Sequence, residues 1–313
     1  MLARIAAPLL TATRARQGTY SIVARDPATG ELGVAVQSHW FSVGPIVPWA
    51  QPGVGAVATQ ANAEVSYGPR ALELLSDGAS APDALARLLA DDPGRETRQV
   101  AVVDAGGAVA AHTGGQCMAY AGDVQGDGVS CQANIMATER VWPAMLEAHS
   151  TAAGSGLPLA ERLLKALEAA EGAGGDLRGR QSAAILVVPG SGRPWDTVVS
   201  LRVEDHPDPL AELARVYRLH EAYLLAGQAD ELAGSGRHSE AARLYIRACE
   251  LAPESHELRF WAGLGAAQSG DLEAGLRDVR AAIAQQPGWL ELLGRLTPEQ
   301  APAAASVRER LRG

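Results

Sequence analysis

Alternating small apolar residues predict a β-hairpin in the stretch TYSIVARDPATGELGVAVQS, which runs from Thr19 to Ser38. Thr19 to Ala24 is rich in β-forming residues, and Leu32 to Val36 provides the second apolar run. The segment between them, Asp26 to Gly30, supplies turn chemistry, because proline fixes φ and glycine permits positive φ. The hairpin therefore begins at a threonine that directly follows a glycine.

Apolar runs and alternation predict further strands along the chain. These are Gly53 to Thr59, Gln99 to Asp104, Val109 to Thr113, Val129 to Ile135, Ala183 to Val188 and Thr197 to Val203. Apolar stripes with helical spacing predict helices over residues 68–90 and about 139–171, each interrupted once by glycine-containing turns. The order of strands and helices predicts an α+β fold of layered antiparallel sheets with helices outside, rather than a Rossmann alternation.

The acidic, proline-rich segment 204–209 predicts a boundary, after which the pattern is wholly helical. We therefore divide the chain into a leader (1–18), a main domain (19–207) and an all-α domain (208–313). Gly236, Ala248 and Pro253 recur 34 residues later as Gly270, Ala282 and Pro287, and this period is typical of tetratricopeptide-like repeats. Two interpretations remain open: residues 210–290 form a groove for a protein partner, or the helices are a packing or dimerisation appendage that supports a homo-oligomer.

The charge distribution argues against a nucleic-acid partner. The 313 residues carry a net charge of -9. Residues 1–18 hold three arginines and no acid, residues 19–207 hold 12 basic and 21 acidic residues, and residues 208–313 hold 12 and 15. No predicted domain is basic, as binding through phosphate neutralisation would require. No apolar run approaches the roughly 20 residues that span a bilayer, so we expect no membrane partner.

The leader and the cysteines indicate a cytoplasmic protein. The apolar stretch from Ile5 to Leu10 is short and broken by Pro8, which makes a poor secretory signal. The leader is a removable propeptide, a disordered arm or the product of a mis-called start codon. Cys117, Cys131 and Cys249 are too few and too scattered for a disulfide framework or a four-ligand zinc site, which fits a reducing compartment. No metal or organic cofactor is implied.

Thr19 is the candidate nucleophile. A threonine hydroxyl needs a base to remove its proton. If the chain began at Thr19, its own α-amine, with an unperturbed pKa of about 7.7–8.0, would lie within reach of that hydroxyl. Gly18 would give the backbone the freedom to expose its carbonyl to attack by the Thr19 hydroxyl. The alternative is that Thr19 is an ordinary strand residue.

The quoted hairpin resembles the opening strands of N-terminal-nucleophile (Ntn) hydrolases, including proteasome β-type subunits. Residues 19 to about 209 look like the bacterial domain-of-unknown-function family 1028. The matching stretches are TYSIVARD, GVAVQS, VGPIVPWAQPGVGAVATQANAEVSYGPRALELL, AAHTGGQC, GGDLRGRQSAA and DHPDPLAEL. The resemblance implies a four-layer αββα sandwich, amide hydrolysis and Thr19 as nucleophile.

This chain departs from that pattern in three ways. Family members commonly start Met-Thr, whereas here 18 residues must be removed. The lysine that supports the threonine in proteasome β subunits has no counterpart in Gly44 to Ala50, and the chain's single lysine is Lys165 in a predicted helix. Gln37-Ser38 stands where those subunits place an acid, so the α-amine would act without that support.

Polar side chains at strand ends are the candidate oxyanion or substrate donors. They are Ser38, Gln60, Asn62, Asn134, Arg180, Gln181 and Ser182. Each has a structural alternative, as a cap, a backbone partner or, for Arg180, a surface ion pair. Arg180 is also a candidate for binding an anionic substrate through its guanidinium fork.

Two functions follow. In the first, the chain is an amidohydrolase that loses residues 1–18 and uses Thr19 on an unidentified small-molecule or peptide amide. In the second, it is a non-catalytic binding or assembly protein that retains the fold, and the helical tail docks a partner.

Overall fold

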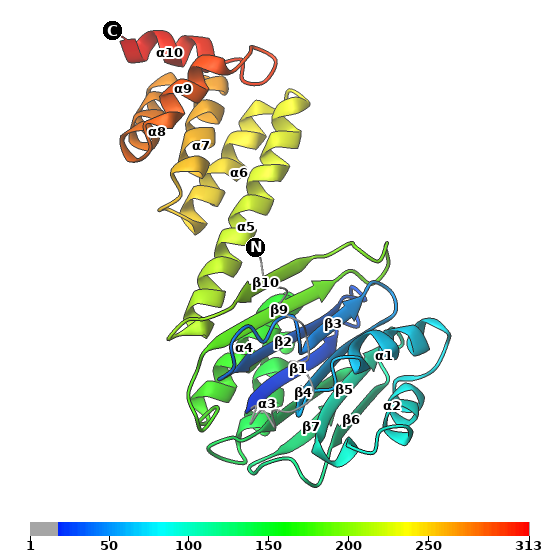
Figure 1. Cartoon of the computed structure of the whole chain (residues 1–313). Coiled ribbons are helices and arrows are strands. Elements are labelled where there is room, and N and C mark those ends of the chain that lie inside the picture. Colours follow the sequence, from blue (N-terminus) through cyan, green and yellow to red (C-terminus); the bar gives the residue numbers. More distant parts are fainter. Residues whose placement is uncertain (1–17, 313) are drawn as a thin grey trace, which may run out of the picture. The chain divides into compact units, whose positions relative to one another are not determined.

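The structure is a computed structural model that describes residues 18–312 (Figure 1). It divides into two compact units, the first ending at Ala214 and the second starting at Arg215. The division falls inside helix α5 (Pro209–Gly234), shortly after the boundary we placed between residues 207 and 208. Except for Gly18, the predicted leader lies outside the described residues. We describe each unit by itself.

The described strands of the first unit form two antiparallel sheets, which confirms the predicted α+β class with antiparallel sheets. The six-stranded sheet contains β1 (Thr19–Arg25), β2 (Leu32–Ser38), β7 (Gly122–Gly126), β8 (Val129–Asn134), β9 (Ser182–Val188) and β10 (Val199–Val203), in the order β10-β9-β2-β1-β8-β7. The four-stranded sheet contains β3 (Pro48–Gln51), β4 (Gly55–Ala61), β5 (Arg98–Asp104) and β6 (Val109–Thr113), in the order β3-β4-β5-β6.

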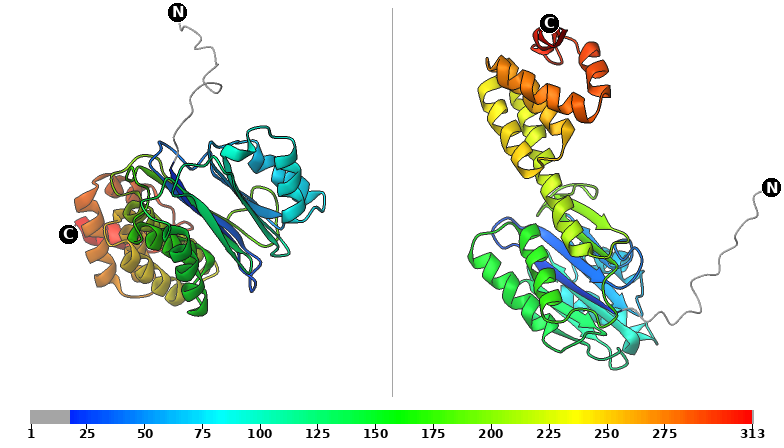
Figure 2. Two further views of the ribbon diagram at one scale, coloured as in Figure 1. Left: turned by 90° about the horizontal axis from the view of Figure 1, so that it is seen from below. Right: turned by 90° about the vertical axis from the view of Figure 1, so that its left-hand side faces the viewer.

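Each sheet carries a pair of helices on its outer face (Figure 2, left). Helices α1 (Tyr67–Ser76) and α2 (Ala81–Ala90) pack on the four-stranded sheet, and a short 3₁₀ turn, Arg95–Thr97, leads into β5. Helices α3 (Val141–Gly154) and α4 (Leu159–Gly172) pack on the six-stranded sheet. Apolar positions at helical spacing produce these pairs, because each helix buries one stripe against a sheet.

The two sheets face one another across a core of small side chains. Val23, Val34 and Val36 from the six-stranded sheet pack against Ala58 and Val103 from the four-stranded sheet. Toward the start of β1 the facing positions become polar, although they remain buried. This polar end of the core is therefore the place where the sandwich departs from simple hydrophobic packing.

His149 on α3 is also buried, and it makes the stability of the fold depend on pH. Burial, together with the nearby Arg162, lowers the pKa of His149 to about 4, while Asp26 opposes that shift. Arg162 itself binds Asp26 at 2.8 Å. The fold therefore favours neutral His149, whereas the unfolded chain binds a proton below a pKa of about 6.5.

We expect this histidine to contribute stability above about pH 6.5, and that contribution to be lost as the pH falls from 6.5 toward 4. The shift corresponds to about 3 kcal/mol. Urea unfolding of the parent and of His149→Leu at about pH 7 and about pH 4.5 measures it, and the parent should lose more stability than the variant. Equal losses in both chains would contradict the assignment.

The second unit is helical, as predicted for the C-terminal region. Beyond α5 its described helices are α6 (His238–Leu251), α7 (His256–Gln268), α8 (Leu272–Gln285), α9 (Gly288–Arg295) and α10 (Ala304–Arg312). Gly236 and Gly270 precede α6 and α8 in left-handed conformations, with φ of 79° and 105°. A Cβ at Gly275 would lie 2.6 Å from the carbonyl oxygen of Gly263, so α7 and α8 pack too closely there for the alanine found one repeat earlier at position 241.

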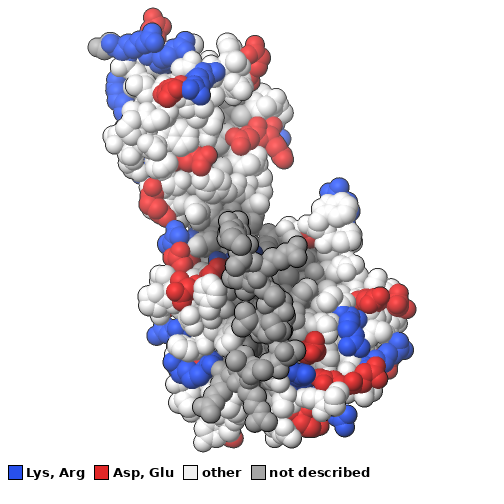
Figure 3. Space-filling view, in the orientation of Figure 1, with Lys and Arg blue, Asp and Glu red and all other residues white. Residues whose placement is uncertain are grey.

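Surface charge is mixed on both units. On the face shown in Figure 3, acidic and basic side chains of the described residues are interspersed. Among residues 18–312, none of the helices is both long enough and apolar enough to cross a bilayer.

Candidate active site

A row of hydroxyl and amide side chains crosses the six-stranded sheet at the start of β1. Thr19 lies directly opposite Ser38 on β2 and opposite Asn134 on β8, and Ser38 in turn lies opposite Ser182 on β9. Directly opposed residues of antiparallel strands point to the same face of a sheet. The register therefore brings four of the predicted residues to one edge of the inner face.

Thr19 and Ser38 form a hydrogen-bond chain that ends on the carbonyl of Gly18. Ser38 Oγ donates to the Gly18 oxygen at 2.5 Å, and the two hydroxyl oxygens lie 3.0 Å apart. A hydroxyl has one proton to donate. Ser38 uses its proton on Gly18, so Thr19 must donate to Ser38. The Thr19 hydroxyl is thus oriented, and the adjacent carbonyl is polarised.

Arg178 supplies the second donor to the same carbonyl. Its Nη2 lies 2.8 Å from the Gly18 oxygen and 2.8 Å from Oδ2 of Asp176. The Asp176 side chain is fully buried and also accepts the backbone N–H groups of His39 and Arg178. Because this carboxylate holds the guanidinium in place, the Gly18 carbonyl has two fixed donors, the arrangement that stabilises negative charge on an oxygen.

Asp176 and Arg178 were not among the site residues predicted from the sequence. Both lie in the stretch GGDLRGRQSAA, from which we had selected Arg180. The available signal was an acidic residue two positions before an arginine, in a segment flanked by glycines. This pattern did not specify which arginine would approach the Gly18–Thr19 bond.

Gly18 fits this site because it has no side chain. A Cβ there would lie 2.7 and 2.8 Å from the two Asp176 carboxylate oxygens and 2.9 Å from Arg178 Nη2. Real Cβ atoms do not approach heavy atoms that closely. From the sequence, the backbone freedom of glycine was the expected reason for Gly18. The close approach of Asp176 and Arg178 is a second, steric reason.

Below this row, the candidate donors Gln60 and Asn134 belong to a buried amide network between the sheets. Gln60 Nε2 donates to Gln99 Oε1 at 2.8 Å and lies 3.3 Å from the Thr19 carbonyl oxygen. Asn134 Nδ2 also donates to Gln99 Oε1, at 2.9 Å, and Ser21 Oγ donates to Gln60 Oε1 at 2.6 Å. These side-chain amides form hydrogen bonds with one another, so in this chain they support the backbone of Thr19.

The backbone is strained beside two members of this network. Ala61 follows Gln60 with φ of 65°, and Ile135 follows Asn134 with φ of 58°. Left-handed conformations are costly for residues other than glycine, and especially for a β-branched isoleucine. Such strain occurs preferentially at functional sites, where surrounding structure holds it in place.

The remaining predicted residues form their hydrogen bonds with other groups. Ser182 Oγ donates to the Trp40 carbonyl at 2.5 Å and accepts from the Val43 N–H, so it holds the loop after β2. Exposed Asn62 binds Thr97, and Gln181 binds Asp205. Exposed Arg180 forms ion pairs with Glu171 at 2.9 Å and Asp208 at 3.1 Å.

The cysteines of the first unit are poor nucleophiles. Burial raises the pKa of the Cys117 thiol to about 11 and raises the pKa of Cys131 still further. The reactive form of cysteine is the thiolate, so both side chains remain protonated at neutral pH.

Thr19 itself is enclosed, with an exposed fraction of 1%. Chemistry on a separate substrate therefore requires a rearrangement that opens access to this hydroxyl.

Comparison with known proteins identifies the first unit. The model of a family of unknown function, DUF1028, matches residues 19–213. The crystal structure of protein SPO2555 from Silicibacter pomeroyi, which belongs to the same family, is similar with 35% sequence identity and a TM-score of 0.58. The match covers 64% of this chain and 88% of that one. No curated protein matches the chain significantly. The chain belongs to the DUF1028 family.

Proposed function

We propose that the chain is the precursor of an Ntn-type amidohydrolase, which cuts its own Gly18–Thr19 bond and then uses Thr19 as the nucleophile. One observation supports this most directly: the carbonyl of Gly18 receives hydrogen bonds from Ser38 Oγ and Arg178 Nη2, and the Thr19 hydroxyl lies in the same chain of bonds. The two sheets with outer helix pairs agree with the four-layer αββα sandwich of Ntn hydrolases.

Self-cleavage would begin with attack of Thr19 Oγ1 on the carbonyl carbon of Gly18. The Oγ1–C bond forms, the C–N bond breaks, and the proton of the Thr19 hydroxyl is transferred to the departing nitrogen. The result is an ester between Gly18 and Thr19. Water then hydrolyses the ester, releases residues 1–18 with a new carboxylate, and leaves the α-amine of Thr19 free. Ser38 and Arg178 stabilise the negative charge on the carbonyl oxygen in both steps.

Turnover of a separate substrate would reuse the same groups. The free α-amine takes the proton from Oγ1, the hydroxyl attacks an amide carbonyl, and the leaving amine receives that proton. Water then hydrolyses the acyl-enzyme, and the carboxylic acid product leaves. Departure of Gly18 frees the donors of Ser38 and Arg178 for the substrate carbonyl. The substrate class is a small-molecule or peptide amide.

Intact-mass measurement and N-terminal sequencing of the purified protein test the proposal. The expected mature chain begins at Thr19 and lacks residues 1–18. It should hydrolyse members of an amide panel, whereas freshly prepared precursor should not. A chain that still carries residues 1–18 and is fully active would overturn the proposal.

The alternative function is a non-catalytic binding or assembly protein, in which a tetratricopeptide-like tail docks a partner. The observation that favours it is the enclosure of Thr19, which is 1% exposed. It predicts that the leader stays attached in the purified protein, and that changing Thr19 affects stability alone.

A further inference from the structure

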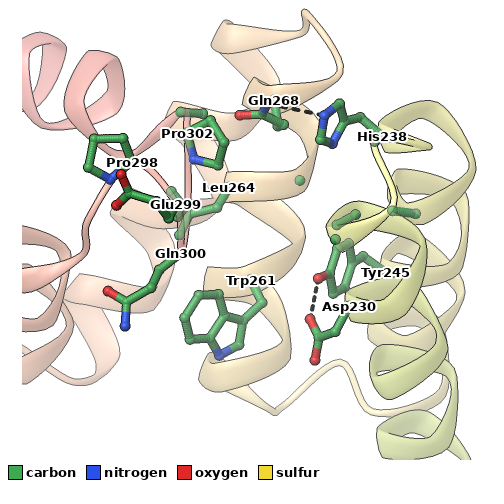
Figure 4. A pocket seen from close by; sticks show the side chains of 17 residues that line it. Asp230, His238, Tyr245, Trp261, Leu264, Gln268, Pro298, Glu299, Gln300 and Pro302 are labelled. Atoms are coloured by element: carbon green, nitrogen blue, oxygen red, sulfur yellow. Dashed lines mark hydrogen bonds between the residues drawn. The ribbon is translucent and has the colours of Figure 1, made fainter.

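The second unit contains a cavity of about 700 Å³ that the proposed chemistry at Thr19 does not use. Figure 4 shows its walls. Tyr245 and His238 come from α6, Trp261, Leu264 and Gln268 come from α7, and Asp230 comes from α5. The loop between α9 and α10 forms the opposite wall with Pro298, Glu299, Gln300 and Pro302. Ligand sites of proteins commonly have volumes of this size, roughly 300–1,000 Å³.

The charged groups in the cavity wall all have the same sign. Asp230 and Glu299 contribute carboxylates, and no lysine or arginine is among the described lining residues. The two carboxylates belong to different walls, and Glu299 extends on the side of Pro298, away from Asp230 (Figure 4). A cation at either carboxylate would gain a favourable interaction, whereas an anion would meet repulsion.

One of these carboxylates is already oriented. Tyr245 donates its hydroxyl proton to Oδ1 of Asp230, and Tyr245 is itself almost fully buried. Oδ2 of Asp230 is therefore the oxygen available to a ligand. The indole of Trp261 lies beside Asp230 in the cavity (Figure 4), and an indole face attracts cations more strongly than other aromatic rings do.

The cavity wall also contains hydrogen-bonding side chains. Nε2 of His238 lies 3.4 Å from Nε2 of Gln268. Gln268 and Gln300 add carboxamides, which both donate and accept hydrogen bonds and can bind a peptide backbone.

We propose that this cavity binds a peptide through an arginine side chain, with the guanidinium on the Asp230 carboxylate and stacked on Trp261, while Glu299 adds negative charge to the opposite wall. Arginine fits better than lysine because its planar group stacks on aromatic rings, and its fork of donors can pair with a carboxylate through two hydrogen bonds. A peptide fits better than a lone cation because the cavity is larger than one side chain needs and its amides match a peptide backbone. All lining residues belong to the second unit, so the site is independent of the chemistry at Thr19.

Isothermal titration calorimetry of the full chain with four short peptides tests this site. The peptides carry a central arginine, lysine, citrulline or glutamate in an otherwise neutral sequence. The arginine peptide should bind best. Asp230→Asn should weaken its binding about fivefold, and Glu299→Gln, which removes the charge of the opposite wall, about twofold. Both residues are exposed, so the variants should fold. Glu309→Gln, an exposed acid on α10, is the matched control and should change nothing.

Two results would overturn the proposal. One is equal affinity for the citrulline and arginine peptides, because citrulline keeps the shape and removes the charge. The other is no measurable binding of the arginine peptide at about 1 mM. If N-acetylarginine amide binds as tightly as the peptide, the ligand is a small molecule that contains a guanidinium, and the peptide part of the proposal is wrong.

Discussion

A chain that carries Thr19→Ala should keep residues 1–18 and should hydrolyse no amide. The substitution removes the oxygen that would attack the Gly18 carbonyl, and also the first donor in the chain that leads through Ser38. Loss of a nucleophile that acts together with its partners costs about 10⁴-fold or more in rate. Intact mass of the purified chain and turnover of the amide panel measure the two effects.

Thr19→Ser is the conservative counterpart, since it keeps the hydroxyl and should still process. Thr151→Ala is the matched control, because Thr151 is an exposed threonine on α3. Chemical unfolding of all three variants separates catalysis from stability. If Thr19→Ala loses its leader or retains turnover, Thr19 is not the nucleophile.

The sequence pattern predicted the outline of the first unit because its elements are encoded locally. Alternation located the β1–β2 hairpin, and apolar stripes located the helix pairs, since each depends on neighbours within a few residues. The edge strands β3 and β7 were missed. They have only four and five residues, and they contain Pro48, Gly122 and Gly126, residue types that are depleted in strands.

The candidate site was only partly predictable, for the same physical reason. Thr19, Ser38 and Asn134 stand at strand ends, which marked them as polar groups at the edge of an apolar sheet. The hydrogen bond from Arg178 to the Gly18 carbonyl joins residues 160 positions apart, and no local pattern encodes such a contact. Our choice of Arg180 identified the right segment, but the structure places that side chain in exposed ion pairs with Glu171 and Asp208.

The proposed peptide cavity was predictable only in part. The helical repeat suggested a groove over residues 210–290, yet one wall of the cavity is the loop around Glu299, beyond that range. This loop contributes one of the two carboxylates that give the cavity its charge. Its position opposite Asp230 results from the packing of α9 and α10 against α7 and α8, which periodicity alone does not specify.

Gly18→Ala should slow self-cleavage by about 10²–10³-fold while leaving the fold intact. The added Cβ would lie within 2.9 Å of the Asp176 carboxylate and of Arg178 Nη2. Asp176 cannot retreat easily, because it is buried and accepts hydrogen bonds from His39 and Arg178. The Gly18 carbonyl must therefore shift away from its two donors, and its alignment with the Thr19 hydroxyl is lost. The time course of leader release, followed by intact mass, measures the rate.

Two companion chains make this result specific. Gly154→Ala is the matched glycine control, since nothing lies within 4 Å of a Cβ there, and it should process normally. A chain that starts Met-Thr19 bypasses the cleavage, because removal of methionine alone exposes the threonine, so it should be active whatever residue once stood at position 18. If Gly18→Ala processes as fast as the parent, then Asp176 and Arg178 do not hold the scissile carbonyl. If the Met-Thr19 chain is correctly trimmed but inactive on every amide, then self-cleavage and turnover are separate properties, and only the first belongs to this site.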